Sequence, residues 1–240
     1  MRVTPYACPQ IIGCLAVVAA GIGLAGWAFW RGWQRGEWMG AEIAVLLIFG
    51  LWVLLFFRNP ARTIPAGEHL LVAPADGVVT HVDRVASLSV AGDGQTPAPH
   101  AFMPGEAQRV SIFLSVFDVH LNRAPLAGKV VFKEYRRGAF FDARREESHG
   151  KNERMDIGIE PGDPGAPRVV IRQLSGLIAR RIVCVPEPGD VLERGQTYGM
   201  IKFGSRTSLF VPADAQVEWR VKPGDKVRAG ETILGVYTQK

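Results

Sequence analysis

The chain has 240 residues, which is room for one domain of about 150 residues and a smaller supplement. It is 48% hydrophobic and 21% charged, a composition that excludes a disordered or fibrous chain. Three of the five net positive charges lie in residues 1–63, so the rest lacks the basic surplus of a nucleic-acid-binding domain. The cysteines Cys8, Cys14 and Cys184 form no CxxC pair and no even set, which argues against a disulfide framework and a zinc site.

The N-terminal quarter is strongly apolar. No charged residue occurs in Val3–Trp30, and the last 20 residues of this run are enough to cross a bilayer core. A second apolar run, Ile43–Phe57, has 15 residues and either spans with tilt or re-enters the membrane. A cleaved signal peptide has a shorter apolar core and no second run after it. The sequence therefore predicts a helical membrane hairpin within residues 1–63, turned at Arg31–Gly40.

Positive charges at the ends of these runs bear on orientation. Arg2, Arg58 and Arg62 lie on the side of the following domain, and Arg31 and Arg35 lie on the other side. The excess of positive charge favours a protein of the cell (inner) membrane whose folded domain is cytoplasmic.

Residues 64–240 form a second, β-rich domain in this prediction. Gly and Pro recur about every ten residues, and the apolar runs between them are short, as in folds built from short strands. Leu70–Ala73 and Val78–Val82 are predicted strands on either side of a tight turn, Pro74–Gly77. A longer strand is predicted over Val110–His120, which would place His120 at the end of a mostly buried strand.

The C-terminal region contains an internal repeat. Five positions recur 35 residues apart: Pro188, Gly189, Asp190, Gly195 and Thr197 return as Pro223, Gly224, Asp225, Gly230 and Thr232. Turns of this type, each followed by a short strand, are how small sandwiches of the biotinyl and lipoyl type build a half-unit. The predicted fold class is therefore mainly β, a β-rich sandwich with lipoyl/biotinyl-like half-units, preceded by an α-helical membrane hairpin.

Gly204 and Ser205 interrupt an otherwise strand-like run, Met200–Pro212. Gly weakens a strand and marks a bulge or a close backbone approach, so the simplest interpretation of the pair is a β-bulge. No GxSxG motif surrounds Ser205, which argues against a hydrolase of the α/β type.

The segment Phe203–Thr207 resembles the self-cleavage site of the phosphatidylserine decarboxylase proenzymes, particularly the shorter bacterial and archaeal type. Further motifs resemble that family in the same order along nearly the whole chain from Phe57: Phe57–Pro60, Pro74–Gly77, Phe117–Pro125, Asn152–Arg154 and Gln173–Ile182. Several motifs in order are more specific than any one of them.

The resemblance implies that the chain cuts itself between Gly204 and Ser205. The Ser205 hydroxyl would attack the Gly204 carbonyl, and β-elimination followed by loss of ammonia would leave a pyruvoyl group at residue 205. The products, chains 1–204 and 205–240, would remain together as a heterodimer, and a homodimer of that unit is also compatible with the sequence. Glycine suits this site because it leaves the attacking oxygen room at the carbonyl.

The resemblance also assigns three catalytic residues, Asp76, His120 and Ser205. A serine hydroxyl is a weak nucleophile that needs a base, and the base needs a group to orient it. Without the resemblance, His120 could equally well be a histidine of the core, and Asp76 could be an ordinary turn residue. Asp118, two residues before His120, is an alternative orienting carboxylate.

The implied reaction is decarboxylation of phosphatidylserine to phosphatidylethanolamine and CO2. A covalent pyruvoyl group, derived from Ser205, would form a Schiff base with the substrate amine and act as the electron sink, so no diffusible cofactor is implied. No metal site is predicted, and ester-linked and ether-linked lipids are not distinguished. Two alternatives stay open: a membrane-anchored β-sandwich adaptor or carrier without catalysis, and an uncleaved Ser-His-Asp lipid hydrolase.

Overall fold

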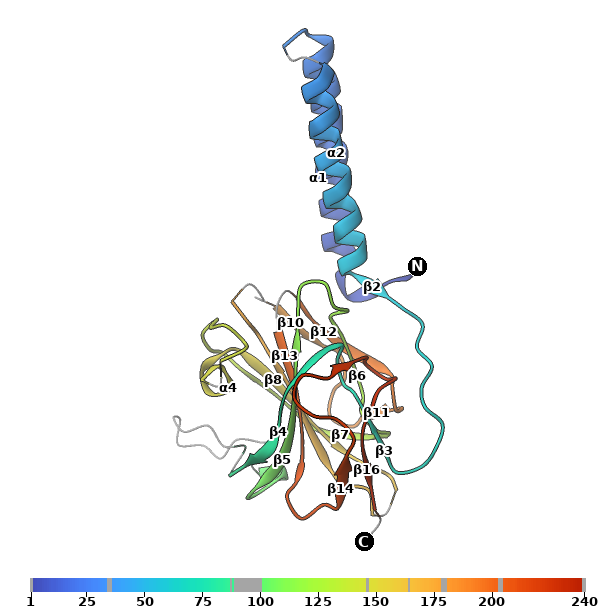
Figure 1. Ribbon diagram of the computed structural model, residues 1–240, viewed down its shortest axis with the longest axis vertical. Coiled ribbons are helices and arrows are strands. Elements are labelled where there is room, and N and C mark those ends of the chain that lie inside the picture. The colour runs from blue at the N-terminus through green and yellow to red at the C-terminus, as the bar shows by residue number, and fades with distance from the viewer. Residues whose placement is uncertain are drawn as a thin grey trace. The chain divides into compact units, whose positions relative to one another are not determined.

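The computed structural model describes residues 2–33, 36–86, 88, 101–145, 147–163, 165–177, 181–202 and 205–238. The chain divides into two compact units, Met1–Pro60 and Ala61–Lys240. The first is mainly helical and the second mainly β, so the predicted fold class is confirmed (Figure 1).

The first unit is a helical hairpin. Helices α1 (Cys8–Trp30) and α2 (Gly36–Phe56) pack side by side, and the short strands β1 (Arg2–Val3) and β2 (Arg58–Asn59) pair at its base, where the 3-10 turn η1 (Pro5–Ala7) also lies. Both helices are long and apolar enough to cross a membrane. Helix α2 is longer than the predicted apolar run Ile43–Phe57, since it begins at Gly36 and includes the charged residues Glu37 and Glu42. Its 21 residues span about 31 Å.

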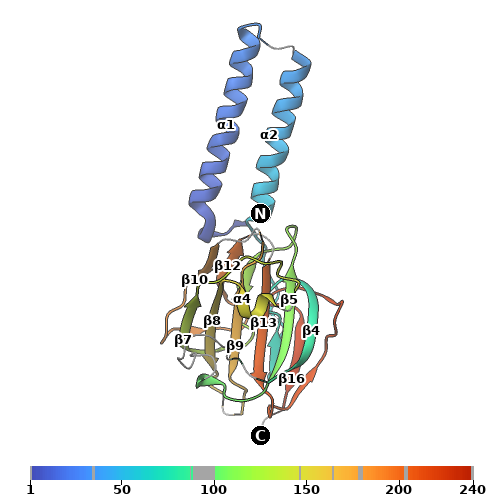
Figure 2. The ribbon, with the colours of Figure 1, turned by 90° about the vertical axis from the view of Figure 1, so that its left-hand side faces the viewer.

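The second unit contains an eight-stranded antiparallel sheet and two three-stranded sheets. The large sheet has the order β11-β7-β8-β9-β13-β5-β4-β15, and the small ones are β10-β12-β6 and β14-β16-β3 (Figures 1 and 2). A four-residue helix, α4 (Ser148–Lys151), lies outside the sheets. The strands, in chain order, are β3 (Leu70–Val72), β4 (Gly77–Val85), β5 (Ala107–Leu114), β6 (Leu121–Arg123), β7 (Gly128–Arg136), β8 (Arg154–Glu160), β9 (Val169–Leu174), β10 (Arg181–Cys184), β11 (Val191–Leu192), β12 (Thr197–Lys202), β13 (Ser205–Pro212), β14 (Val217–Trp219), β15 (Lys226–Val227) and β16 (Ile233–Tyr237).

One face of the large sheet supplies the main hydrophobic core. Alternate residues on the central strands point into it and are almost completely buried, as the two-residue period of a strand requires. They include Val110, Ile112, Ile157, Ile171 and Leu209. The small sheets add Leu71, Tyr198 and Leu234 to the same core.

The predicted strand Val110–His120 is wrong in its second half. Strand β5 ends at Leu114, and a turn follows in which the Asp118 carboxylate accepts a hydrogen bond from the Ser115 N–H at 2.8 Å. The Asp118 N–H in turn donates to the Ser115 carbonyl at 3.0 Å. This local capping competes with strand formation, and so His120 lies just before β6 rather than at the end of β5.

The repeat in the sequence is also a repeat in the structure. Strands β11 and β15, which follow the two Pro-Gly-Asp turns, form the two opposite edges of the large sheet. The turns make equivalent backbone hydrogen bonds, each of 2.8 Å, to strands β7 and β4 and to the segments before them: Gly189 to Val130, Gly224 to Val79, Gly195 to Ala124 and Gly230 to Ala73. The β domain is therefore built from two similar halves.

The two halves are not consecutive in the chain. One half runs from β6 to β12 without interruption, whereas the other combines β3–β5 with β13–β16. The chain consequently passes from one half to the other twice, once in residues 115–120 and once between the end of β12 at Lys202 and the start of β13 at Ser205. The predicted functional residue His120 lies in the first of these connections, and Ser205 is the first residue after the second.

Gly77, at the start of β4, provides a stability test. Its φ is +146°, and an added Cβ would lie directly against the Phe113 carbonyl oxygen of the neighbouring strand. We expect Gly77→Ala to lower the free energy of unfolding by about 2–4 kcal/mol, measured by thermal melting of the solubilised protein. Gly224→Ala is the control, because Gly224 also has a positive φ but open space around it, and should cost about 1 kcal/mol. Equal losses would contradict the steric explanation.

Candidate active site

Ser205 is the first residue of the central strand β13. It pairs with Leu114 of β5, and its neighbour Arg206 pairs with both Phe113 of β5 and Leu174 of β9. The Ser205 side chain is completely buried, and its Oγ has no hydrogen-bond partner among the described residues. A buried hydroxyl of this kind is unusual and marks Ser205 as a candidate reactive group. Gly204, the other half of the predicted cleavage site, lies outside the described residues.

His120 is hydrogen-bonded through its main chain to the strand that precedes Ser205. It is completely buried, and its carbonyl accepts a hydrogen bond from the N–H of Ile201 on β12, the strand that ends three residues before Ser205. The ring Nδ1 lies 2.9 Å from the Asp118 carbonyl oxygen. In a neutral ring this contact places the proton on Nδ1 and leaves Nε2 as the basic nitrogen.

Asp118 therefore contacts the His120 ring through its main chain. Its carboxylate caps the turn at Ser115, as described above. The main-chain carbonyl of Asp118 therefore helps to fix the His120 ring. An orienting acid would contact the ring through its carboxylate, but the Asp118 carboxylate contacts the Ser115 N–H instead.

Asp76 is buried in the turn before β4, at the same end of the sheet as Ser205. Its carboxylate accepts hydrogen bonds from Arg62 Nη2 at 2.6 Å and from the Ala229 N–H at 2.7 Å. Burial raises the pKa of Asp76, the Ala229 and Arg62 contacts lower it, and the charge of Asp118 raises it.

Arg62 was not recognised from the sequence as part of this site. It was expected to flank the membrane, but its guanidinium is buried between Asp76 and Glu231, at 2.6 and 3.1 Å. Arg62, near the start of the β domain, thus forms an ion pair with the candidate catalytic residue Asp76.

A buried polar network joins four of the motif segments. The Asn122 Nδ2 donates to Thr207 Oγ1 at 2.9 Å and approaches the Pro74 carbonyl at 3.4 Å. The Asn122 Oδ1 accepts from Gln173 Nε2 at 2.8 Å. Asn122 follows His120 by two residues, and Thr207 follows Ser205 by two, so this network fixes both candidate residues to the turn that carries Asp76. Sequence reasoning missed it.

The other face of the large sheet carries buried charge. Arg172 makes a bidentate ion pair with Asp156, at 2.8 and 2.9 Å, and Arg154 lies 3.5 Å from the same carboxylate. Burial and the charge of Arg172 lower the pKa of Arg154 to about 10. Arg206, next to Ser205, is completely buried. This face of the sheet thus buries three arginines, Arg154, Arg172 and Arg206, and the carboxylate of Asp156.

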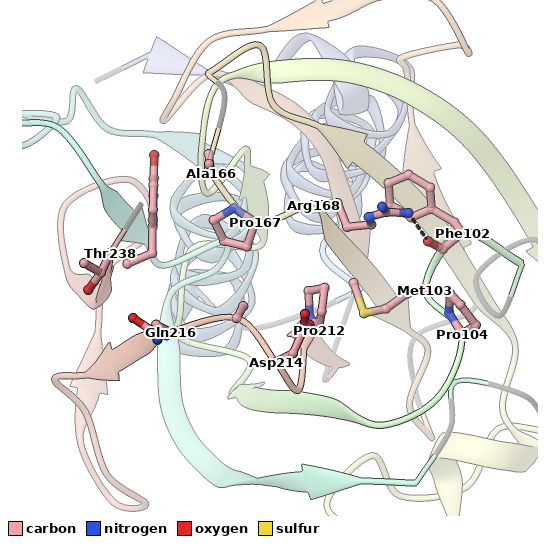
Figure 3. A pocket seen from close by; sticks show the side chains of 13 residues that line it. Phe102, Met103, Pro104, Ala166, Pro167, Arg168, Pro212, Asp214, Gln216 and Thr238 are labelled. Atoms are coloured by element: carbon pink, nitrogen blue, oxygen red, sulfur yellow. Dashed lines mark hydrogen bonds between the residues drawn. The ribbon is translucent and has the colours of Figure 1, made fainter. Parts of the chain in front are cut away.

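Two cavities lie elsewhere. One of about 440 Å³ is formed around Pro212, at the opposite end of β13 from Ser205, where Arg168 donates to the Phe102 carbonyl at 2.9 Å (Figure 3). The other, of about 1030 Å³, is lined by residues that include Lys129 and Glu160. Neither is lined by Ser205, His120 or Asp76. Within the described part of the chain, no three His, Cys, Asp or Glu side chains are grouped as metal ligands.

Comparison with known proteins agrees with the motif order. The family model described as phosphatidylserine decarboxylase matches residues 49–235. The "phosphatidylserine decarboxylase proenzyme" of Pelobacter propionicus is 48% identical over 195 residues, covering 81% of this chain and 80% of the relative. That of Symbiobacterium thermophilum is 45% identical over 201 residues, covering 84% and 85%. That of Geotalea uraniireducens is 44% identical over 193 residues, covering 80% and 83%.

The match extends over the β domain and into helix α2, and includes all the segments that meet at Asn122. The resemblance seen in the motifs is confirmed, and the chain belongs to the phosphatidylserine decarboxylase family.

Proposed function

We propose that this protein decarboxylates phosphatidylserine to phosphatidylethanolamine and CO2 by the Schiff-base route of a self-generated pyruvoyl group at Ser205. The observation that carries the proposal is the position of Ser205. Its Oγ is buried, has no hydrogen-bond partner among the described residues, and lies within the family's motif, three residues after strand β12, whose Ile201 is hydrogen-bonded to His120. The relatives named above as phosphatidylserine decarboxylase proenzymes support the same conclusion.

Formation of the active enzyme would begin with Ser205. Its Oγ loses a proton and attacks the Gly204 carbonyl carbon, and the C–N bond breaks so that an ester replaces the amide. Removal of the Ser205 Cα proton then expels the Gly204 carboxylate and leaves a dehydroalanine. Addition of water releases ammonia and leaves a pyruvoyl group. The two products are chains 1–204 and 205–240.

His120 is the proposed base for the first step. Its Nδ1 faces the Asp118 carbonyl, so Nε2 is the basic nitrogen that would take the Ser205 proton, and the ring is fixed by burial. Asp76 is the proposed electrostatic partner. Its carboxylate, held by Arg62 and Ala229, favours the positively charged imidazolium that forms when His120 takes the proton.

The surroundings of Ser205 fit a pyruvoyl group. Residue 205 begins a strand that is paired on both sides, so its position does not depend on the peptide bond to Gly204. Such a group supplies a carbonyl that condenses with the primary amine of the head group and takes up the electron pair released as CO2 leaves. His120 is the proposed donor that returns a proton to the substrate.

The two chains would remain associated after cleavage. Residues 205–240 contribute β13 to the centre of the large sheet and β14 and β16 to a small sheet. This supports the heterodimer. The homodimer, the location in the inner membrane and the cytoplasmic position of the β domain remain proposals that rest on sequence alone.

The first experiment is the intact mass of the purified protein and of Ser205→Ala. The wild type should give two chains, broken before Ser205, and the smaller one should have a blocked N-terminus that borohydride reduces. Ser205→Ala should give one uncut chain. One uncut chain in both samples would exclude the pyruvoyl enzyme and leave the adaptor or the hydrolase, which an esterase assay separates.

The role of Asp76 predicts a pH effect. The Arg62 charge favours the ionised carboxylate of Asp76 and so lowers its pKa, whereas burial raises it. Arg62→Gln removes the lowering effect, and the Asp76 pKa should rise further. The ionised fraction at a given acidic pH falls, and the acid limb of the self-cleavage rate should move to higher pH. Gel analysis of freshly synthesised precursor across a pH series measures this shift. Arg84→Gln, at an exposed position on β4, should leave the profile unchanged; an unshifted Arg62→Gln profile would exclude this role for Asp76.

Asn122→Leu tests the buried network. The change leaves Thr207 and Gln173 without their partner and should cost about 2–4 kcal/mol of stability. It should also slow self-cleavage, because His120 and Ser205 are no longer fixed to one another. Asn152→Leu is the matched control: Asn152 is equally buried, but its bonds to Phe141 and Ser175 hold a different loop. If both variants slow cleavage equally for equal loss of stability, Asn122 has no positioning role.

A further inference from the structure

Two exposed apolar side chains flank the start of β13. Phe117 is 75% exposed and Leu177 is 67% exposed, although each follows a strand whose side chains are almost all buried. Large apolar side chains placed together in solvent mark an interaction surface more often than chance exposure does.

The strand register places these side chains on both sides of Ser205. Strands β5 and β9 are the two neighbours of β13. Leu114 of β5 pairs with Ser205, and Phe117 follows it by three residues; Leu174 of β9 pairs with Arg206, and Leu177 follows it by three. Both side chains therefore leave the sheet at the end where β13 begins.

Hydrogen bonds within the loop that carries Phe117 keep this side chain exposed. The hydrogen bonds between Ser115 and Asp118 fix the turn, and the next two residues, Val119 and His120, are buried. Figure 2 shows this green loop rising beyond the strand ends of the sheet. The same short segment thus places His120 in the interior and Phe117 in solvent.

An exposed cation accompanies the apolar pair. Arg181 is exposed at the start of β10, four residues after Leu177. Arg144 is also exposed, and its Cζ lies 5.9 Å from the centre of the Phe113 ring, but its charge is paired with Asp142 at 2.6 Å. Apolar side chains with neighbouring cations are typical of a surface that enters an anionic bilayer.

We propose that Phe117 and Leu177 insert into the interface of a bilayer that contains anionic phospholipid, so that the head group reaches residue 205 directly from the membrane. This inference rests on the proposed function. The partner is a lipid surface, and Arg181 is the exposed cation that would meet its phosphates and carboxylates.

The test compares two forms of the substrate with one enzyme preparation. The full-length protein is reconstituted in vesicles of phosphatidylcholine and phosphatidylserine, and CO2 release is measured from the bilayer lipid and from a water-soluble dihexanoyl phosphatidylserine. Phe117→Ser, Leu177→Ser and the double variant should lose about tenfold or more on the bilayer lipid, the loss expected when large apolar side chains no longer enter it. Their rates on the soluble lipid should match the wild type.

Val191→Ser is the matched control. Val191 is 71% exposed, but it pairs with Lys129 at the opposite end of the large sheet, and its variant should equal the wild type on both lipids. Unchanged rates of the Phe117 and Leu177 variants on the bilayer lipid would overturn the inference, as would equal losses on both lipids. A wild type inactive on both lipids would instead contradict the proposed function.

A second measurement needs no variant. Wild-type protein in vesicles that contain a lipid with a photoreactive acyl chain is irradiated, and the adducts are mapped by peptide mass spectrometry. Adducts are expected around Phe117 and Leu177 but not around Val191. Their absence around both Phe117 and Leu177 would contradict insertion, even if a variant failed to mature.

Discussion

The pairing of β13 with β5 and β9 is the constraint on which the rest of the structure depends. Ser205 occupies the first position of this strand, and both neighbouring strands belong to the chain that precedes it. Ser205 pairs with Leu114 of β5, and from Arg206 onward the strand pairs with both β5 and β9, so the start of β13 is held without the bond to Gly204. A central strand can therefore begin at a broken bond without loss of the core that it helps to form.

The two similar halves of the β domain explain why the site lies where it does. One half is inserted into the other, and the chain passes between them in residues 115–120 and again between the end of β12 and the start of β13. His120 lies in the first connection, outside the strands, and Ser205 begins the strand that follows the second. The network around Asn122 then connects these segments to the turn at Asp76 by buried hydrogen bonds.

The sequence predicted what depends on local pattern. Charge-free runs indicated the helices, the residue types of Pro74–Gly77 indicated a turn, and the spaced Pro-Gly-Asp motifs indicated the half-units. The order of family motifs identified Ser205, His120 and Asp76 as candidates, and the cleavage itself stays a prediction. The end of β5 was missed because a carboxylate cap at Asp118 overrides a strand-like sequence.

Contacts between distant residues could not be predicted in this way. Asn122 bonds to Gln173 and Thr207, which are 51 and 85 residues away in the chain. Arg62 is only 14 residues from Asp76. Because it follows an apolar run, the sequence alone is equally well explained by a positive charge at the membrane surface. In both cases a polar residue has two plausible roles, and only the fold determines which of them it has.

The pairing of β3 with β16 has a consequence for the timing of maturation. Val72 pairs with Ile233, so one of the first strands of the β domain to be synthesised waits for the last. Contacts between such distant segments form slowly, because a long loop must close first. Self-cleavage that depends on the folded arrangement of Ser205 would thus be post-translational, and a second chain in a cell extract would report that folding of the whole domain had been completed.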